Sequence, residues 1–340
     1  MARKISAGGS SGYLEGPAEN LFSPARTYRS LTIFREILSS AATEAEFERR
    51  IREAFTFWEA TGEGRAKPIL LTGYYEPIIE GQLEPGGGYH YPIYRRPADL
   101  IEMAPRENFR ERAEKNRIGR WEKGQAVPYY SRKEIDCQGV LQGKGYELVW
   151  LKDPWERYVL HVQGSGQIRL PDGRTLRVGF AASNGRPYRS IGRYMVEQGF
   201  LADKELSLSG VREFIRQHPE RMDEIFNINE RYIFFRSIPG KEGPIGALGF
   251  PLTAGRSVAT DLTIFPPGAL AYLTAQQPVV DEAGRLKTRK TLRRFVLNQD
   301  TGAAMKGPDR VDLFCGSGDQ AGRVAGAMRE EGKIYFLCAK

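Results

Sequence analysis

From residue 245 onward, short runs of β-branched and aromatic residues end at glycine or proline corners. The clearest of these runs are "GALGFPLTAGRSVATDLTIFPPGALAYL", "RRFVLNQD", "RVDLFC" and "KIYFLCAK". The chain has 38 glycines and 20 prolines, spread along it rather than gathered in one tract, and this favours many tight turns. Short strands joined by irregular long crossings predict a small closed β-barrel rather than a parallel sheet with alternating helices.

The N-terminal part adds one amphipathic helix and one strand. Residues 1–30, rich in Gly, Ser, Ala and Pro, are expected to be a loosely ordered lead-in. The segment "TEAEFERRIREAFTFWEA" opens with a capping box formed by Thr43 and Glu46. Its apolar residues recur at helical spacing as far as Trp58, so a helix is predicted through that residue. "KPILLTGYYEP" reads as a strand that ends before Pro77.

The middle of the chain is also expected to be rich in β-structure. "YELVWL" and "RYVLHVQGSGQIRL" are typical of strands, and Asp172 and Gly173 supply a hairpin turn. Two short helices follow, the second interrupted by Pro219, and "RYIFFR" returns to strand. At 340 residues the chain is expected to form one large or two moderate domains, mainly β with a few helices.

The charge balance narrows the choice of partners only partly. Lys and Arg number 50 against 42 Asp and Glu, a net charge of +8 that favours an anionic partner such as nucleic acid, acidic lipid or an anionic glycan. The sequence has neither a clustered basic stripe nor a nucleic-acid-binding motif, so we expect no nucleic-acid partner. It has no run of 18 apolar residues. No secretory signal is recognisable in "MARKISAGGSSGYLEGPAE", so either the protein is cytoplasmic or its export segment is missing.

Cysteine and histidine do not form a recognisable site. They lie far apart and show neither CxxC nor HExxH spacing: Cys137, Cys315, Cys338, His90, His161 and His218. We therefore expect no metal and no cofactor.

Carboxylates remain as candidates for chemistry. In "RVDLF" the strand alternation puts Asp312 on the face of Arg310, with Val311 and Leu313 on the opposite, buried face. An aspartate in mid-strand is disfavoured, so it needs a compensating role. Taken alone, an edge-strand ion pair with Arg310 is the favoured interpretation.

A second aspartate, Asp300, ends the preceding strand, so one loop can bring it and Asp312 to the same barrel mouth. Two nearby carboxylates push each other's pKa apart, leaving one ionised and one protonated, as acid-catalysed glycosidic cleavage requires. Asp261 also ends a strand-like run, where it is either a third member of this group or a turn cap.

Hydroxyl, amide and aromatic groups that suit a carbohydrate accompany these carboxylates. Sugars present apolar ring faces and directional hydroxyl groups, which such side chains complement. The candidate substrate-binding residues are Thr72, Tyr74, Gln163, Ser165 and Lys306.

The chain resembles the MltA-type lytic murein transglycosylases. Nine segments carry the resemblance, in order over roughly residues 67–340: "TGYYEP", "YPIYRRP", "YYSRKEID", "WLKDPWERYVLHVQGSG", "NGRPYRSIGR", "RYIFFR", "GALGFPLTAGRSVATD", "QDTGAAMKGPDRVDLFCGSGDQAGRVAGAM" and "GKIYFLCAK". The C-terminal part also resembles a module named for three aspartates, here Asp261, Asp300 and Asp312. Ala303 stands where the family often has glycine.

The resemblance implies a double-psi β-barrel domain, built from residues 1–76 and 239–340, and a second, barrel-like β-domain inserted at residues 77–238. It places the glycan in a groove between the two domains. It makes Asp312 the acid and then the base that cleaves the β-1,4 bond between N-acetylmuramic acid and N-acetylglucosamine, forming a 1,6-anhydro end. Asp300 is its supporting neighbour.

Two alternatives stay open at this point. An inverting glycoside hydrolase on the same barrel would use a second carboxylate as base for water, roughly 6.5 to 9.5 Å from the acid. A non-catalytic peptidoglycan-binding module would use the same groove without chemistry.

The resemblance also sets expectations about partners and location. It implies peptidoglycan glycan strands as partner, contact with cell-wall synthesis complexes, and a monomer in the periplasm associated with the outer membrane. The family commonly has a lipid anchor on an N-terminal cysteine, whereas the first cysteine here is Cys137. Membrane association is therefore expected only through an anchor missing from this sequence.

Overall fold

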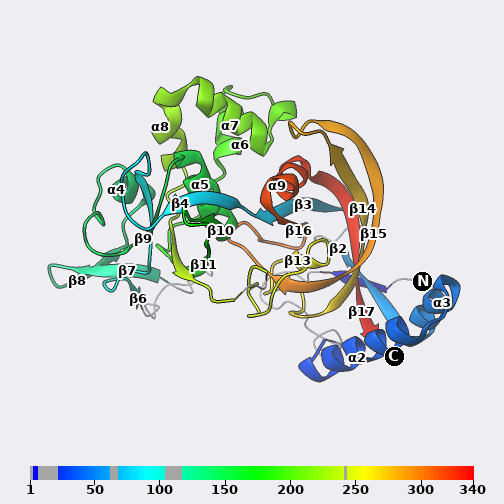
Figure 1. Cartoon of the computed structure of the whole chain (residues 1–340). Coiled ribbons are helices and arrows are strands. Elements are labelled where there is room, and N and C mark those ends of the chain that lie inside the picture. The colour runs from blue at the N-terminus through cyan, green and yellow to red at the C-terminus, as the bar shows by residue number, and fades with distance from the viewer. Residues whose placement is uncertain (1–2, 7–21, 62–67, 104–116, 241–242) are drawn as a thin grey trace. The chain divides into compact units, whose positions relative to one another are not determined.

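The computed structural model describes residues 3–6, 22–61, 68–103, 117–240 and 243–340 (Figure 1). The chain divides into two compact units. The first, here called the barrel unit, comprises Met1–Tyr75, Ile245–Gly316 and Gln320–Lys340, and the second, the insert unit, comprises Glu76–Pro244 and Ser317–Asp319. Three separate stretches of chain thus build the barrel unit, the last two interrupted only by Ser317–Asp319.

The barrel unit contains a closed ring of six strands, as the short strands with glycine and proline corners predicted. In sheet order they are β17 (Arg329–Ala339), β14 (Leu270–Val280), β15 (Leu286–Asp300), β13 (Ser257–Ala259), β16 (Arg310–Ser317) and β3 (Ile69–Glu76). The ring closes because β17 pairs with β3 as well as with β14. β2 (Phe55–Thr61) extends the sheet on β17, and β1 (Arg3–Ser6) pairs with β2.

Apolar side chains from every strand of the ring fill the barrel. Leu71, Val258, Leu273 and Val311 are each completely buried. Two helices, α2 (Pro24–Ser40) and α3 (Glu44–Ala54), contribute Ile37 and Ile51 to a second apolar cluster with strand residues. Helix α9 (Gly318–Ala327) lies close to β3, where a Cβ on Gly73 would come within 2.8 Å of the Cα of Ala325. Burial of these faces holds the strand ends in fixed positions.

Two N-terminal predictions were wrong in part. Helix α2 begins at Pro24, so the expected loose lead-in ends earlier than residue 30; residues 7–21 lie outside the described part of the chain. Ser23 caps this helix and Pro24 occupies its first turn, which are ordinary signals of a helix start. Helix α3 ends at Ala54, and Trp58 lies on β2 rather than on the helix.

The two ends of α3 explain why its start was predicted correctly and its end was not. The backbone N–H of Glu46 donates to the Thr43 hydroxyl at 3.1 Å, while the Glu46 carboxylate accepts from the N–H of Ala42 at 3.0 Å. After Ala54 the residues are "FTFWEAT", whose β-branched and aromatic side chains favour a strand. Pairing with β17 then satisfies this backbone, an option that helical spacing alone could not reveal.

The insert unit has its own six-stranded sheet. In sheet order the strands are β12 (Ile233–Ser237), β11 (Thr175–Ser183), β10 (Ser165–Arg169), β4 (Ile78–Gln82), β9 (Glu147–Leu151) and β5 (Tyr91–Tyr94). A single bridge between Arg95 and Phe235 joins the two outer strands, so the sheet is barrel-like. A smaller sheet holds β6 (Ile101–Met103), β7 (Arg117–Glu122) and β8 (Gln125–Pro128). The prediction of a mainly β chain with a few helices is confirmed.

The helices of the insert unit are short. They are α4 (Arg132–Asp136), α5 (Pro154–Gln163), α6 (Ile191–Glu197), α7 (Leu208–Gln217) and α8 (Met222–Asn227), with single 3-10 turns at Asp203–Glu205 and Pro219–Arg221. Helix α5 corrects the prediction of a strand through "YVLHVQ". Asp153 caps it, Pro154 occupies the first turn and Gly164 ends it with φ 77°. Because most of the helix is buried, its apolar residues lack the alternation that separates strand from helix.

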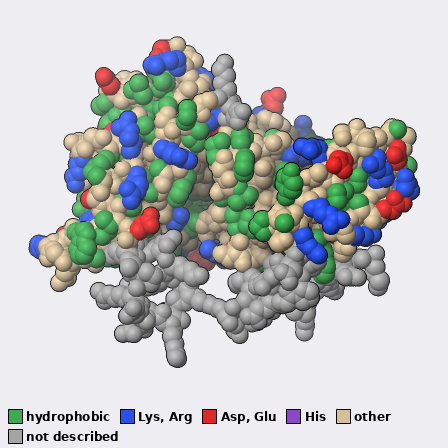
Figure 2. Space-filling model, turned by 90° about the horizontal axis from the view of Figure 1, so that it is seen from below, with side chains coloured by type: hydrophobic (Ala, Val, Ile, Leu, Met, Phe, Trp, Pro, Cys, Tyr) green, Lys and Arg blue, Asp and Glu red, His purple; other side chains and the backbone are tan. Residues whose placement is uncertain are grey.

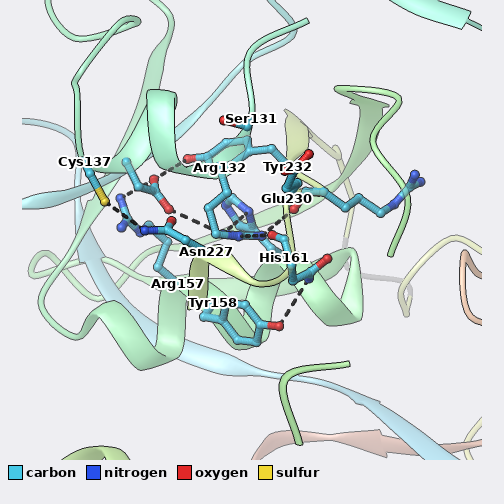
Figure 3. A network of polar contacts seen from close by, with 12 residues as sticks. Ser131, Arg132, Cys137, Arg157, Tyr158, His161, Asn227, Glu230 and Tyr232 are labelled. Carbon is cyan, nitrogen blue, oxygen red and sulfur yellow. Dashed lines mark hydrogen bonds and ion pairs between the residues drawn. The ribbon is translucent and has the colours of Figure 1, made fainter. Parts of the chain in front are cut away.

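A polar network ties α4 and α5 to the segment just before β12 (Figure 3). Arg132 donates to the backbone carbonyls of Asn229 and Arg231 at 2.9 and 2.6 Å. Asp136 lies 2.8 Å from Arg157 and 3.4 Å from Arg132, so two guanidinium groups share one carboxylate. The side chains of Arg132, Arg157 and Asp136 are 1%, 10% and 8% exposed, so two positive charges and one negative charge meet inside the unit.

Two surface properties bear on partners. None of the helices in the described ranges is both long and apolar enough to cross a membrane. On the face shown in Figure 2, lysine and arginine side chains lie among hydrophobic and other groups rather than in one continuous patch.

Candidate active site

Strand β16 places Asp312 where its alternation predicted. Val311 and Leu313 point into the barrel core, with 0% and 1% of their surface exposed. The side chain of Asp312 is 14% exposed, so it keeps limited access to solvent. In the ladder Asp312 lies opposite Ala259 of β13.

Asp300 lies at the end of β15, opposite the other side of the same Ala259. The two aspartates therefore stand two strands apart on one sheet, with Cα atoms separated by roughly 10 Å for ordinary strand spacing. Three groups donate to the Asp300 carboxylate, each at 2.9 Å. Oδ1 accepts the backbone N–H groups of Ala247 and Thr301, and Oδ2 accepts the hydroxyl of Tyr74.

Arg310 precedes Asp312 by two residues on the same face of β16. Its Nε donates to Asp312 Oδ1 at 3.1 Å, and its terminal nitrogen donates to Oδ2 at 3.2 Å. The same Nε lies 3.3 Å from the Thr72 hydroxyl of β3, which accepts from it. The ion pair between Arg310 and Asp312 that "RVDLF" predicted is thus present, and it lies two strands from the Asp300 carboxylate.

Burial raises the pKa of both aspartates. For Asp312, loss of hydration is the largest cause; the guanidinium of Arg310 opposes it, and the charge of Asp300 adds to it. For Asp300, burial is again the largest cause of the raised pKa, and its three hydrogen-bond donors oppose it. Burial together with the neighbouring Asp300 raises the pKa of Tyr74 well above its usual value. A carboxyl group with a raised pKa can carry a proton closer to neutral pH than a free aspartate.

Tyr74 and Thr72 lie on the same face of β3 and contact the carboxylate pair in different ways. Tyr74 binds Asp300, and its ring packs against Phe314 with centroids 5.3 Å apart. Thr72 is linked to Asp312 through Arg310, whose Nε donates to both. Both residues were expected to bind substrate, and the structure places them beside the two aspartates.

Asp261, the third candidate, has another set of partners. Its Oδ1 accepts from the N–H and hydroxyl of Thr263 at 3.1 and 2.7 Å, and its Oδ2 accepts the N–H of Gly307 at 3.0 Å. It is 7% exposed. These contacts are those of a turn cap that also fastens the loop between Asp300 and Asp312.

The remaining candidates are less closely tied to this group. Lys306 is exposed on the loop that Asp261 fastens. Gln163 ends α5 and Ser165 begins β10, so both belong to the insert unit and are half-buried there. The structure therefore brings together Thr72, Tyr74, Asp300 and Asp312 within the barrel unit.

The backbone donor at Ala247 was not predicted from the sequence. It lies on the loop before β13, where Ile245 and Pro251 form a bridge and the N–H of Gly246 donates to the carbonyl of Phe250 at 2.9 Å. An N–H group has no residue-type signal, so only the fold reveals it. Within the described ranges, no three His, Cys, Asp or Glu side chains gather in a way that could hold a metal ion.

Family models match two parts of the chain. Residues 70–236 match the MltA specific insert domain, and residues 256–338 match the 3D domain. The first matched range contains Thr72 and Tyr74, and the second contains Asp261, Asp300 and Asp312.

Individual proteins match over most of the chain. Membrane-bound lytic murein transglycosylase A of Escherichia coli K12 is 31% identical over 283 residues, which cover 82% of this chain and 68% of that protein. The crystal structure of membrane-bound lytic murein transglycosylase from Agrobacterium tumefaciens is similar, with TM-score 0.75 and 29% identity over 92% of this chain and 84% of that one. E. coli MltA with bound chitohexaose gives TM-score 0.73 and 26% identity, covering 95% and 85% of the two chains.

Proposed function

Because the chain belongs to the MltA family of membrane-bound lytic murein transglycosylases, we propose that it cleaves the glycan strands of peptidoglycan with Asp312 as acid and base. The bond cut is the β-1,4 bond between N-acetylmuramic acid and N-acetylglucosamine. The observation that carries the assignment is the position of Asp312. It is a largely buried carboxyl group with a raised pKa, paired with a cation and two strands from a second carboxylate.

The reaction needs one proton to move out and another to move back. Protonated Asp312 gives its proton to the glycosidic oxygen as the bond to C1 of the muramoyl residue breaks, which frees the N-acetylglucosamine hydroxyl. The resulting carboxylate then takes the proton of the muramoyl 6-hydroxyl, whose oxygen bonds to C1 and closes the 1,6-anhydro ring. Asp312 ends protonated, as it began, and no water is consumed.

Asp300 supports this cycle as a fixed negative charge. Its three donors leave it little freedom to reorient, and they oppose the larger effect of burial, which raises its pKa. A base for water in a hydrolase would have to reach the sugar, whereas Oδ1 of Asp300 is occupied by two backbone N–H groups. The contacts of Asp300 therefore support the lytic reaction over inverting hydrolysis.

The other assignments follow from this proposal. Tyr74, Gln163, Ser165 and Lys306 contact the glycan, while Asp261 shapes the loop that carries Lys306. The protein works as a monomer in the periplasm, in association with the outer membrane, where murein and its synthesis complexes lie. Fractionation of cells that produce the protein from its full gene tests the location, and recovery in the cytosol would contradict it.

Digestion of purified sacculi in water enriched in oxygen-18, followed by mass spectrometry, tests the reaction. We expect muropeptides that end in 1,6-anhydromuramic acid, one water lighter than hydrolysis products and without the heavy isotope. Reducing ends that contain oxygen-18 would show a hydrolase. Protein that binds sacculi but releases nothing would show a binding module.

A further inference from the structure

The proton transfers described above involve Asp312, and they leave the role of its pairing with Arg310 and Thr72 unassigned. Arg310 is placed to act on Asp312 because it holds both carboxylate oxygens, at 3.1 and 3.2 Å. It belongs to the same strand, two residues away, so the strand alternation fixes both side chains on one face. The contact therefore does not depend on a mobile loop.

We infer that Arg310 is a positioning residue for the lytic reaction, which holds the Asp312 carboxylate between the two proton transfers, and that Thr72 is its anchor. This inference rests on the proposed role of Asp312. It also changes the role of Thr72, from substrate binding to support of the guanidinium group.

The geometry accounts for both protonation states of Asp312. A carboxylate accepts through both oxygens and matches the planar fork of a guanidinium, as the structure shows. When Asp312 carries its proton, one of its oxygens becomes a donor and the fork loses an acceptor. The Nε–H, which already lies 3.3 Å from Thr72 Oγ1, keeps that partner. The guanidinium group, on a side chain that is 34% exposed, therefore keeps a protein acceptor in both protonation states of Asp312.

Arg310 acts differently on the ionised and the protonated form of Asp312. Arg310 stabilises the carboxylate that forms when the proton leaves, so it favours donation to the glycosidic oxygen. It also lowers the pKa of Asp312, so the carboxyl group gives up its proton at a lower pH than it would without the cation. In the described part of the chain, the other titratable groups linked to Asp312 are Asp300 of β15, Tyr74 of β3 and Cys315 of β16, and the charge of Arg294 on β15 acts on Cys315.

Arg310→Met removes the fork and keeps most of the apolar stem. We expect kcat to fall between about tenfold and a hundredfold, as for loss of a charged hydrogen-bonded pair. The alkaline limb of the kcat/KM profile should move to higher pH, because the cation that opposes the raised pKa of Asp312 is gone. Arg310→Lys keeps the charge, so it should return the limb towards the parent position and restore kcat only in part.

Thr72→Val tests the anchor without altering any charge. It keeps the shape of the side chain and removes one acceptor from Arg310, so kcat should fall by about threefold to tenfold with the alkaline limb unchanged. Arg285→Met is the matched control. Arg285 donates through Nε to Asp281 at 2.8 Å in the exposed turn between β14 and β15, and its loss should leave kcat and the pH profile as they are.

The outcomes separate this inference from the proposed reaction. If the parent enzyme forms anhydro ends but Arg310→Met keeps the parent pH profile, the role of Arg310 is wrong and the reaction stands. A fall in melting temperature with no movement of the limb would show that Arg310 only stabilises the fold. If Arg310→Met does not fold, Arg310→Lys and Thr72→Val provide the test. An alkaline limb in Arg310→Lys that moves to higher pH as if the charge were absent would overturn the inference. A kcat in Thr72→Val equal to that of the parent would overturn it as well.

Discussion

At the scale of single residues, the two aspartates differ in what surrounds them. Asp300 accepts from three donors, two of them backbone N–H groups that cannot be removed by changing a side chain. Asp312 has one cationic partner and retains some exposure. The contacts therefore support a fixed charge in one case and a proton carrier in the other.

Tyr74 is the side chain through which this difference can be tested. Tyr74→Phe keeps the ring that packs on Phe314 but removes the hydroxyl that donates to Asp300 Oδ2. Loss of a hydrogen bond to a charged group predicts a fall in kcat of about tenfold or more. Turnover of sacculi measures it, with Tyr272→Phe, a tyrosine of β14, as control. Equal turnover in both variants would remove Tyr74 from the account.

The carboxylates could be predicted from the sequence, but their donors could not. Residue type and strand alternation identify Asp312, and the short loop brings Asp300 near it. Ala247 contributes only an N–H group, and it lies 53 residues from Asp300 in the chain, so no local pattern connects them. Thr72 was chosen for its hydroxyl, yet the structure shows that hydroxyl accepting from Arg310.

At the scale of elements, the loop between β15 and β16 depends on Asp261. Asp261→Ala removes acceptors from Thr263 and Gly307, which predicts a loss of about 2 to 4 kcal/mol in the free energy of unfolding. Turnover should fall as the loop loosens, while its pH profile keeps its shape because Asp261 exchanges no proton with substrate. Denaturant titration and initial rates measure these effects.

Asp172→Ala is the matched control for that loop. Asp172 caps the exposed β10–β11 turn by accepting from Arg174, as Asp261 caps its own turn. Its loss should leave turnover unchanged. A changed pH profile in Asp261→Ala would instead make Asp261 a direct participant in catalysis.

Histidine 161 makes the insert unit sensitive to acid. Burial lowers the pKa of His161 well below its usual value, and the charges of Arg132 and Arg157 lower it further. The folded unit therefore holds this histidine neutral, whereas the unfolded chain takes up a proton below about pH 6.5. Stability from this group is present above that pH and is lost by about 1.4 kcal/mol per pH unit as pH falls, down to the folded-state pKa.

His161→Phe keeps a ring against Tyr232 and removes the titration. We expect its free energy of unfolding to fall less between pH 7 and pH 5.5 than that of the parent. Tryptophan fluorescence can follow this, since Trp121, Trp150 and Trp155 lie in the insert unit and Trp58 in the barrel unit. His90→Gln, at an exposed site, is the control. Parallel pH dependences in parent and His161→Phe would contradict the assignment.

Element boundaries show where sequence patterns are insufficient. Trp58 continues the helical spacing of α3 but belongs to β2, because pairing with β17 offers its backbone a better set of partners. The buried helix α5 reads as a strand unless Asp153, Pro154 and Gly164 are recognised as its ends. In both cases the periodicity was compatible with either structure.

At the scale of the whole molecule, the closed barrel could be predicted from many short strands, but the order of its strands could not. The ring closes where Arg329 of β17 pairs with Thr72 of β3, two residues from distant parts of the chain. Alternation shows which face of a strand is buried and says nothing about which strand lies beside it. The sequence predicted domain boundaries after residues 76 and 238, and the structure divides into its two units after Tyr75 and after Pro244.

The central claim is that Asp312 carries the proton in both steps. Its most direct test is the initial rate at which Asp312→Asn releases 1,6-anhydro muropeptides from sacculi, compared with the parent at equal sacculus binding and equal melting temperature. The amide keeps the shape of the side chain but cannot pass a proton. We predict a fall of about a hundredfold or more, in line with loss of a general acid and base. Release within tenfold of the parent would contradict the account.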